Sequence, residues 1–127
     1  MSYEVKFKAG DIEFSAKAVS FGFSRNYDPH TGVPLTETIM QDITVTADGT
    51  KDTKLADWAT NPEMHKDGTI TYFSSKDNSK MMELEFKEGY LSSFQESFGN
   101  GKPLTVCFSI MAKSVSVGNA QFVNEWK

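Results

Sequence analysis

The sequence predicts a mainly β protein, an antiparallel barrel or sandwich of about eight or nine strands, with one flanking α-helix at about residues 52–61. Two observations lead to this fold class. Apolar and polar residues alternate with a period of two through most of the 127 residues, as in strands that bury one face. Only the stretch DTKLADWATNP, residues 52–62, has a helical pattern. A chain of this length is expected to form a single domain over 1–127.

The first strands are expected to form a hairpin. Apolar residues alternate with charged ones over 3–8 and resume at Ile12, after a turn at 9–11. The alternation slips by one residue near Ala18, and the apolar face continues over 19–23. A slip of this kind within a continuing strand is what a β-bulge produces.

A long loop is predicted next, because SRNYDPHTGVPL, residues 24–35, loses the alternation and collects Asn, Asp, Pro and Gly. Loops of this length in compact domains are usually functional or disordered. Tyr27, Val33 and Leu35 give this loop apolar groups to bury, and another subunit is one candidate for what covers them.

The longest clean strand is expected over 38–47, with Ile39, Ile43 and Val45 on one face. A turn then leads to the predicted helix.

In the helix, Leu55, Trp58 and Ala59 fall at positions i, i+3 and i+4 and therefore share one face. Asp52 or Thr53 is expected to cap the first turn, and a proline follows the last. A helix this short is marginal alone, so we expect it to form by docking Trp58 onto the sheet.

The segment from residue 69 to residue 117 is predicted to form strands. A hairpin is expected from 69–74 and 81–87, with Met82, Leu84 and Phe86 pointing inward. Three further strands follow, at 90–98 with Tyr90, Phe94 and Phe98 on one face, at 104–112 with Leu104, Val106, Phe108, Ile110 and Ala112 on one face, and at 114–117.

Composition excludes several classes of protein. A net charge of −4 and a pI of about 5.1 argue against nucleic acid as a partner, because that affinity comes mostly from Lys and Arg. The charged, alternating N-terminus predicts no signal peptide, and the lack of any apolar run of ~20 residues predicts no membrane insertion. We therefore expect a protein made in the cytoplasm. A single cysteine, Cys107, rules out an internal disulfide.

No motif indicates an enzyme, a metal site or a cofactor. His30 and His65 stand in predicted polar loops without a second ligand at metal-binding spacing. Cys107 has no histidine nearby in the sequence and reads as an inert thiol. Two strand faces are polar yet weakly charged, as interface or lumen-lining faces can be: Met40, Thr44 and Thr46, and Thr105, Ser109 and Met111.

Several segments together resemble a known family. They are SFGFSRNYD, DPHTGVP, ETIMQDITVTADGT, KDTKLADWATNP, DGTITYFSSKDNSKMMELEFKEGYL and SVSVGNAQFVNEWK. In their order, and nearly end to end, they are similar to the tube protein of the type VI secretion system, the Hcp or TssD family, in the form found in Bacteroidetes.

The resemblance implies an antiparallel β-barrel with a flanking helix. It also implies hexameric rings that stack into a hollow tube and deliver effectors into neighbouring cells. The implied partners are further copies of this chain, the contractile sheath, spike and baseplate proteins, and effector cargo. Export would proceed through the secretion system without a signal peptide.

The resemblance also implies which residues meet other subunits. The loop from Asn26 to Pro34 would reach a neighbouring subunit or the next ring: Asn26, Tyr27, Asp28, Pro29, His30, Thr31, Gly32, Val33 and Pro34. The family's ending is matched by Gly118, Asn119, Asn124, Glu125 and Trp126.

Two alternatives stay open. A phage-tail-tube-like adaptor shares the physics of ring assembly. A monomeric small-molecule-binding β-barrel would use the Phe-rich interior as a ligand cavity.

Overall fold

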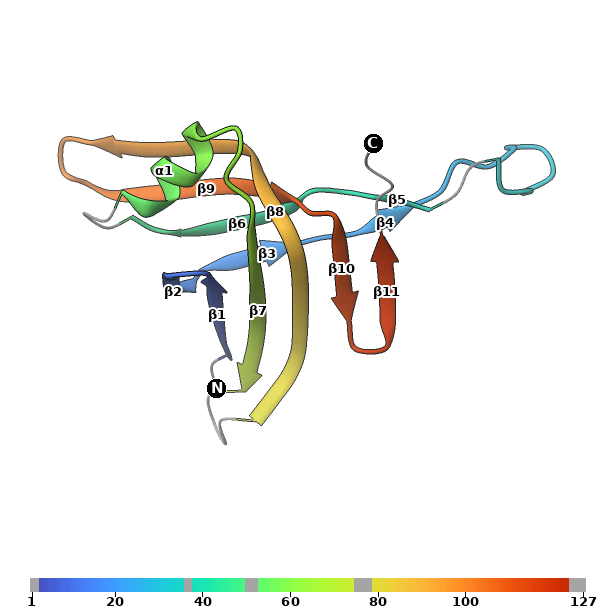
Figure 1. Ribbon diagram of the computed structural model, residues 1–127, viewed down its shortest axis with the longest axis horizontal. Helices are drawn as coiled ribbons and strands as arrows, with labels where there is room; N and C mark the ends of the chain where they lie inside the picture. Colours follow the sequence, from blue (N-terminus) through green and yellow to red (C-terminus); the bar gives the residue numbers. More distant parts are fainter. Residues whose placement is uncertain (1–2, 36–37, 50–52, 75–78, 124–127) are drawn as a thin grey trace.

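The computed structural model describes residues 3–35, 38–49, 53–74 and 79–123. Eleven strands and one helix lie in these ranges (Figure 1). In chain order they are β1 (Tyr3–Ala9), β2 (Ile12–Ala16), β3 (Ala18–Ser20), β4 (Phe23–Ser24), β5 (Ile39–Met40), β6 (Ile43–Asp48), α1 (Lys54–Thr60), β7 (Lys66–Ser74), β8 (Ser79–Gly99), β9 (Lys102–Met111), β10 (Ser114–Val117) and β11 (Ala120–Val123).

Nine of these strands form one antiparallel sheet that curls into a barrel. Seven follow the order β2-β1-β7-β8-β9-β6-β3, and β10 pairs with both β8 and β11. The strands at the two ends of that order, β2 and β3, are separated only by Lys17. The Lys17 N–H donates to the Thr46 carbonyl at 2.7 Å, so the two ends of the sheet meet. The predicted mainly antiparallel β-fold with one helix is confirmed.

The slip of alternation near Ala18 marks a change of partner and not a bulge within one strand. β2 pairs with β1, whereas β3 pairs with β6 on the other side of the barrel. Alternation in the sequence shows only which side chains are buried. A strand that changes its partner therefore shifts the alternation by one residue, just as a bulge does.

The longest strand, β8, is bent and joins the two halves of the barrel (Figure 1). Its first half pairs with β7 and β10, and its second half pairs with β9. At the bend, Glu88 has a positive φ of 52° and its N–H donates to Asp67 Oδ1 at 2.9 Å. The two strands expected at 81–87 and 90–98 are therefore one continuous strand.

Aromatic rings fill the centre of the barrel. The Phe7 ring stacks on Phe14 with centroids 4.9 Å apart and meets Phe108 edge-on at 5.4 Å. The ring centroid of Phe86 lies 6.1 Å from that of Phe7. Such pairs add to the burial of apolar surface, and the aliphatic side chains of β6 and β9 close the layer around them.

The strand expected over 38–47 is interrupted, and the predicted face of Ile39 is wrong. The ladder of β5 ends at Met40 and β6 begins at Ile43. Ile39 is 47% exposed and Met40 is buried, while Ile43 and Val45 are fully buried as expected. The break shifts the alternation by one residue, which regular counting through the segment could not detect.

One burial and one face predicted in β8 also differ. Met82 shares its face with Leu84 and Phe86 in the register, but it is 46% exposed near the start of the strand, whereas Leu84 and Phe86 are buried as expected. Tyr90 pairs with Met111 and Phe94 pairs with Phe108, which are an odd number of residues apart in β9. Tyr90 and Phe94 therefore lie on opposite faces, because a register shift separates them.

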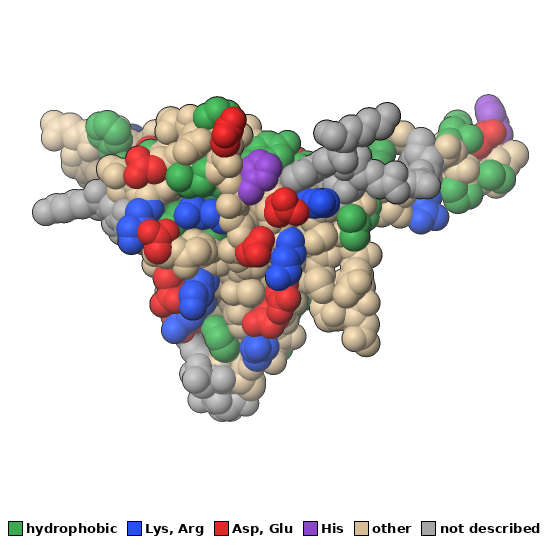
Figure 2. All heavy atoms as spheres, viewed as in Figure 1, with side chains coloured by type: hydrophobic (Ala, Val, Ile, Leu, Met, Phe, Trp, Pro, Cys, Tyr) green, Lys and Arg blue, Asp and Glu red, His purple; other side chains and the backbone are tan. Residues whose placement is uncertain are grey.

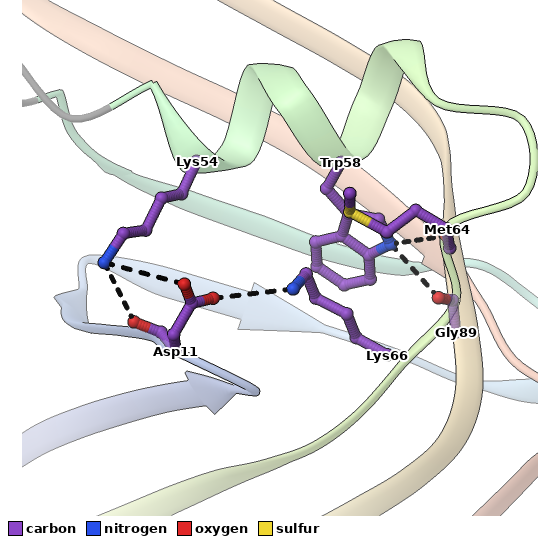
Figure 3. A network of polar contacts seen from close by, with 6 residues as sticks. All are labelled: Asp11, Lys54, Trp58, Met64, Lys66 and Gly89. Carbon is purple, nitrogen blue, oxygen red and sulfur yellow. Dashed lines mark hydrogen bonds and ion pairs between the residues drawn. The ribbon is translucent and has the colours of Figure 1, made fainter.

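Helix α1 is shorter than the expected 52–61 and covers the bend of β8. Thr53 occupies the N-cap position without a side-chain capping hydrogen bond, and Asp52 lies outside the described residues. Trp58 is 1% exposed, and its Nε1–H donates to the carbonyls of Met64 at 3.1 Å and Gly89 at 3.2 Å (Figure 3). Leu55 and Ala59 are half-buried on either side.

Replacing Trp58 with Phe tests how much these hydrogen bonds stabilise the fold. Trp58→Phe keeps an aromatic ring but removes the donor that Met64 and Gly89 share, so we expect a loss of about 1–3 kcal/mol. Trp58→Ala also opens a cavity and should cost about 3–5 kcal/mol. Urea unfolding followed by circular dichroism, at one subunit concentration, measures both. Equal midpoints for Trp58→Phe and the parent would show that the indole N–H adds nothing.

Gly68 tests how closely β7 approaches its neighbours. A Cβ there would meet the Phe86 ring and would lie 2.5 Å from the Lys8 carbonyl oxygen, so Gly68→Ala should destabilise by about 1–3 kcal/mol. Gly99→Ala is the matched control, because its Cβ meets only Lys102 Cδ at 3.7 Å and should change stability by less than about 0.5 kcal/mol. The same unfolding measurement decides it, and similar midpoints for the two variants would contradict the packing argument.

Candidate assembly surfaces

The segment expected as a loop is an arm that projects from the barrel (Figure 1). The arm consists of the described residues 23–35 and 38–40. At its base β4 pairs with β5 as a separate two-stranded sheet. Further out, Tyr27 and Pro34 form an isolated antiparallel bridge. The prediction of an irregular loop was therefore wrong in part, because the arm is a narrow hairpin.

Local hydrogen bonds shape the tip of the arm. The Gly32 N–H donates to the Asp28 carbonyl at 2.7 Å, and the Asp28 N–H donates to the Val33 carbonyl at 2.8 Å. The Asp28 side chain accepts from the His30 N–H at 2.9 Å, as in an Asx turn. Gly32 has a φ of 75°, which glycine adopts without strain. The tip is thus preorganised, which lowers the cost of binding.

The arm carries exposed apolar side chains. Tyr27 is 62% exposed, Val33 55% and Leu35 64%. Arg25, the only arginine of the chain, follows β4 at the base of the arm. Its Nη2 donates a hydrogen bond to Thr38 Oγ1 at 2.8 Å. Apolar groups clustered with an arginine are typical of interface centres.

A groove lies beside α1, on the side of the barrel away from the arm (Figure 1). We call it the α1 groove. Its apolar lining comes from β2, α1, β8 and β9: Ile12, Phe14, Leu55, Phe94 and Val106. Its volume is about 80 Å³, far below the roughly 300–1,000 Å³ typical of small-molecule sites.

The rim of the α1 groove is mainly acidic. Three acidic residues, Glu13, Asp48 and Glu96, and one cation, Lys54, belong to its lining. Asp48 forms an ion pair with Lys17 at 3.0 Å. Within the described part of the chain, Glu13 and Glu96 form no ion pair.

Asp11 links the helix to the β1–β2 turn (Figure 3). Its carboxylate lies 3.8 Å from Lys54 Nζ and 3.5 Å from Lys66 Nζ. A backbone hydrogen bond is the main cause that lowers the pKa of Asp11, and both ammonium groups lower it further. The carboxylate is therefore ionised at neutral pH and pairs with both ammonium groups.

One broad sheet face carries almost no charge. We call it the neutral face, and it lies on β3, β6, β9 and the second half of β8, opposite the core. Its uncharged polar residues are Ser20, Thr44, Thr46, Ser93, Gln95, Ser97, Thr105, Cys107 and Ser109, and its charged residue Asp48 stands opposite Thr105 at the end of β6.

The two polar strand faces singled out in the sequence meet here. Thr44 Oγ1 lies 3.2 Å from Ser109 Oγ, and Thr46 Oγ1 lies 3.8 Å from Cys107 Sγ. Met40 does not join them, because it is buried.

A second sheet face is strongly charged. Figure 2 shows Lys, Asp and Glu side chains intermixed over β7 and the first half of β8. Lys80 pairs with Glu83 at 3.1 Å, and Lys113 pairs with Glu88 at 3.6 Å. Exposed pairs of this kind stabilise little but maintain a hydrated surface. The barrel therefore presents one neutral and one charged face.

The two histidines do not come together. His30 lies exposed at the tip of the arm, and the His65 ring lies 5.8 Å from Tyr90. The described residues contain no group of three His, Cys, Asp or Glu side chains able to hold a metal ion. Cys107 is a free, exposed thiol. Among the described helices, none is long and apolar enough to cross a membrane.

The C-terminal residues are only partly described. Gly118 and Asn119 form the two-residue loop between β10 and β11. Gly118 has a φ of 60°, as the first position of a type II′ hairpin turn requires. Asn124, Glu125 and Trp126 lie outside the described residues.

Two features were not predicted from the sequence. One is β11, which is short and, among the described strands, pairs with β10 alone. The other is Phe98, which is 78% exposed near the tip of the β8–β9 hairpin. The polar GNGKP turn directly after Phe98 was the available signal, because strand ends bury little.

Comparison with known proteins gives one consistent result. Hcp1 from Flavobacterium johnsoniae, a member of the Bacteroidetes, is 28% identical with a TM-score of 0.88, covering 95% of this chain and 99% of that one. Hcp1 from Salmonella typhimurium is 10% identical with a TM-score of 0.69, covering 91% and 85%. A chain from the sheath-tube complex of an extracellular contractile injection system is 19% identical with a TM-score of 0.59. The match covers 89% of this chain and 86% of that one. The last two show the fold alone.

No curated protein matches the chain. The family model of the hemolysin coregulated protein Hcp (TssD), however, matches residues 1–127. With the barrel, the flanking helix and the projecting arm in place, this match shows that the chain belongs to the Hcp (TssD) family.

Proposed function

We propose that this chain is a structural subunit of the type VI secretion tube, in which copies form hexameric rings that stack into a hollow tube. The observation that carries the proposal is the family match over the whole chain, supported by the likeness to Hcp1 from Flavobacterium johnsoniae. The tube would deliver effectors into neighbouring cells. Its partners would be the sheath, spike and baseplate proteins and the cargo, and it would leave the cytoplasm through the secretion system without a signal peptide.

The arm supports this role. A ring or a stack of rings needs a heterologous contact, in which each subunit presents two different patches. The exposed Tyr27, Val33 and Leu35 lie on a projection that its own barrel does not cover. We propose that the segment from Asn26 to Pro34 forms one of the two patches.

The neutral face fits the channel wall. A tube that passes cargo of different charge needs a wall without strong fields, since like charges repel and opposite charges retain. The hydroxyl and amide side chains of β3, β6, β8 and β9 meet this need. The charged face over β7 and the first half of β8 suits the hydrated exterior.

Of the alternatives, the tube of a related contractile injection machine is supported by fold likeness alone. The small-molecule barrel is not favoured, because the packed rings of Phe7, Phe14 and Phe108 fill the interior. The α1 groove, at about 80 Å³, is also too small for such a ligand.

Charging the tip of the arm tests the proposal. Tyr27→Asp combined with Val33→Asp should reduce the fraction of assembled protein at least about ten-fold, because desolvating a carboxylate at an apolar contact costs more than the roughly 1.4 kcal/mol that ten-fold requires. Light scattering and negative-stain images measure the loss. Lys87→Asp, at an exposed position of β8, changes net charge by the same amount and should assemble as the parent does. Rings of unchanged mass in the arm variant would contradict the proposed role of the arm.

The single thiol tests the channel wall. In assembled tubes a small maleimide should still react with Cys107, whereas a long polymer-linked maleimide should react much more slowly than it does with unassembled subunits. The small reagent controls for burial of the thiol within a subunit contact. Equal rates of polymer labelling in both states would place the neutral face outside the channel.

A further inference from the structure

We propose that the arm of one copy docks in the α1 groove of another copy, with Arg25 facing the acidic rim of the groove. The inference rests on the proposed function, because it assumes that copies assemble. It adds the receiving surface and the charge pair that selects it.

The position of the two surfaces requires a second copy. The arm projects from one side of the barrel, and α1 lies over the other (Figure 1). An arm therefore cannot reach the groove of its own chain. A contact between surfaces at opposite ends of a subunit is heterologous, so it can repeat from copy to copy.

The apolar parts match in size. The groove offers a floor of Ile12, Phe14 and Leu55, and its volume of about 80 Å³ suits a side chain and not a whole ligand. The arm offers Tyr27, Val33 and Leu35, each more than half exposed. Docking would remove both surfaces from water, which is the main favourable term in association.

The charges are complementary. Glu13 and Glu96 stand on the groove rim and form no ion pair within the described residues. Arg25 has five N–H donors, and its bond to Thr38 Oγ1 engages only Nη2. A guanidinium binds carboxylates in a planar, two-bond geometry that lysine does not match. The acid nearest the tip, Asp28, already accepts the His30 N–H within the arm.

Charge reversal with rescue tests the pairing. Arg25→Glu, and separately Glu13→Lys with Glu96→Lys, should each lower the assembled fraction by about ten-fold or more, because like charges then face each other. Combining all three substitutions should restore most of it. Lys87→Glu and Glu85→Lys are the matched controls, since they reverse charges on exposed positions of β8 outside the groove lining. Light scattering over a salt series gives the assembled fractions.

The outcomes separate the two proposals. If the parent protein assembles and both charge reversals also assemble normally, the proposed docking of arm and groove is wrong. The tube proposal is unaffected by that result. Losses in both reversals without rescue also overturn the pairing. A parent that stays monomeric at every concentration overturns both.

A cross-link provides a second test that does not depend on charge. In a background of Cys107→Ser, subunits with Val33→Cys are mixed with subunits with Glu96→Cys, reassembled and oxidised. A disulfide needs Cα atoms within about 7 Å, so a covalent heterodimer is expected only when arm and groove meet. Val33→Cys mixed with Glu85→Cys is the control. Assembled rings without the heterodimer, or with equal yields in both mixtures, would overturn the inference.

Discussion

The fold depends on the bend of β8 at Glu88 and Gly89. One strand there leaves its pairing with β7 and β10 and continues along β9, so the two halves of the barrel share a single backbone. A Cβ at Gly89 would press on Phe86 and Ile110, so the bend needs a residue without one. Trp58 covers the bend and donates its Nε1–H to the Gly89 carbonyl. A helix this short is marginal alone, and α1 is stabilised by packing Trp58 against the bend of β8.

Much of the fold could be predicted from the sequence, because alternation reports burial directly. The β1–β2 hairpin, the β7–β8 hairpin and the buried face of β9 follow from it. The errors at Ala18, Ile39 and Tyr90 share one physical cause. Wherever the chain changes partner or shifts register, at Lys17, after Met40 and near Leu91, the period of two restarts with a new phase. Such shifts are fixed by contacts distant in sequence, which local patterns do not contain.

The candidate surfaces were predicted less completely. The apolar residues of the arm could be recognised because they interrupt a polar, turn-rich segment. The neutral face was seen as two separate strand faces, and only the register of β6 against β9 joins Thr44 to Ser109 and Thr46 to Cys107. The α1 groove could not be predicted at all, since its lining comes from elements far apart in the chain. Surfaces built by tertiary packing need the packing to be known.

A tube subunit has to combine strong contacts with its neighbours and weak contacts with its cargo, and the roles that we propose for the arm and the neutral face separate the two by position. Apolar groups and its single arginine are gathered on a projecting arm, where desolvation on assembly makes each contact stronger. The broad sheet face carries hydroxyl groups whose hydrogen bonds are partly satisfied by neighbouring strands, as between Thr44 and Ser109. Such groups gain little by binding a passing surface, because water competes equally well for them. In the proposed tube, the contacts between copies therefore lie on a hairpin outside the core, and the barrel wall that we propose for the channel binds cargo weakly.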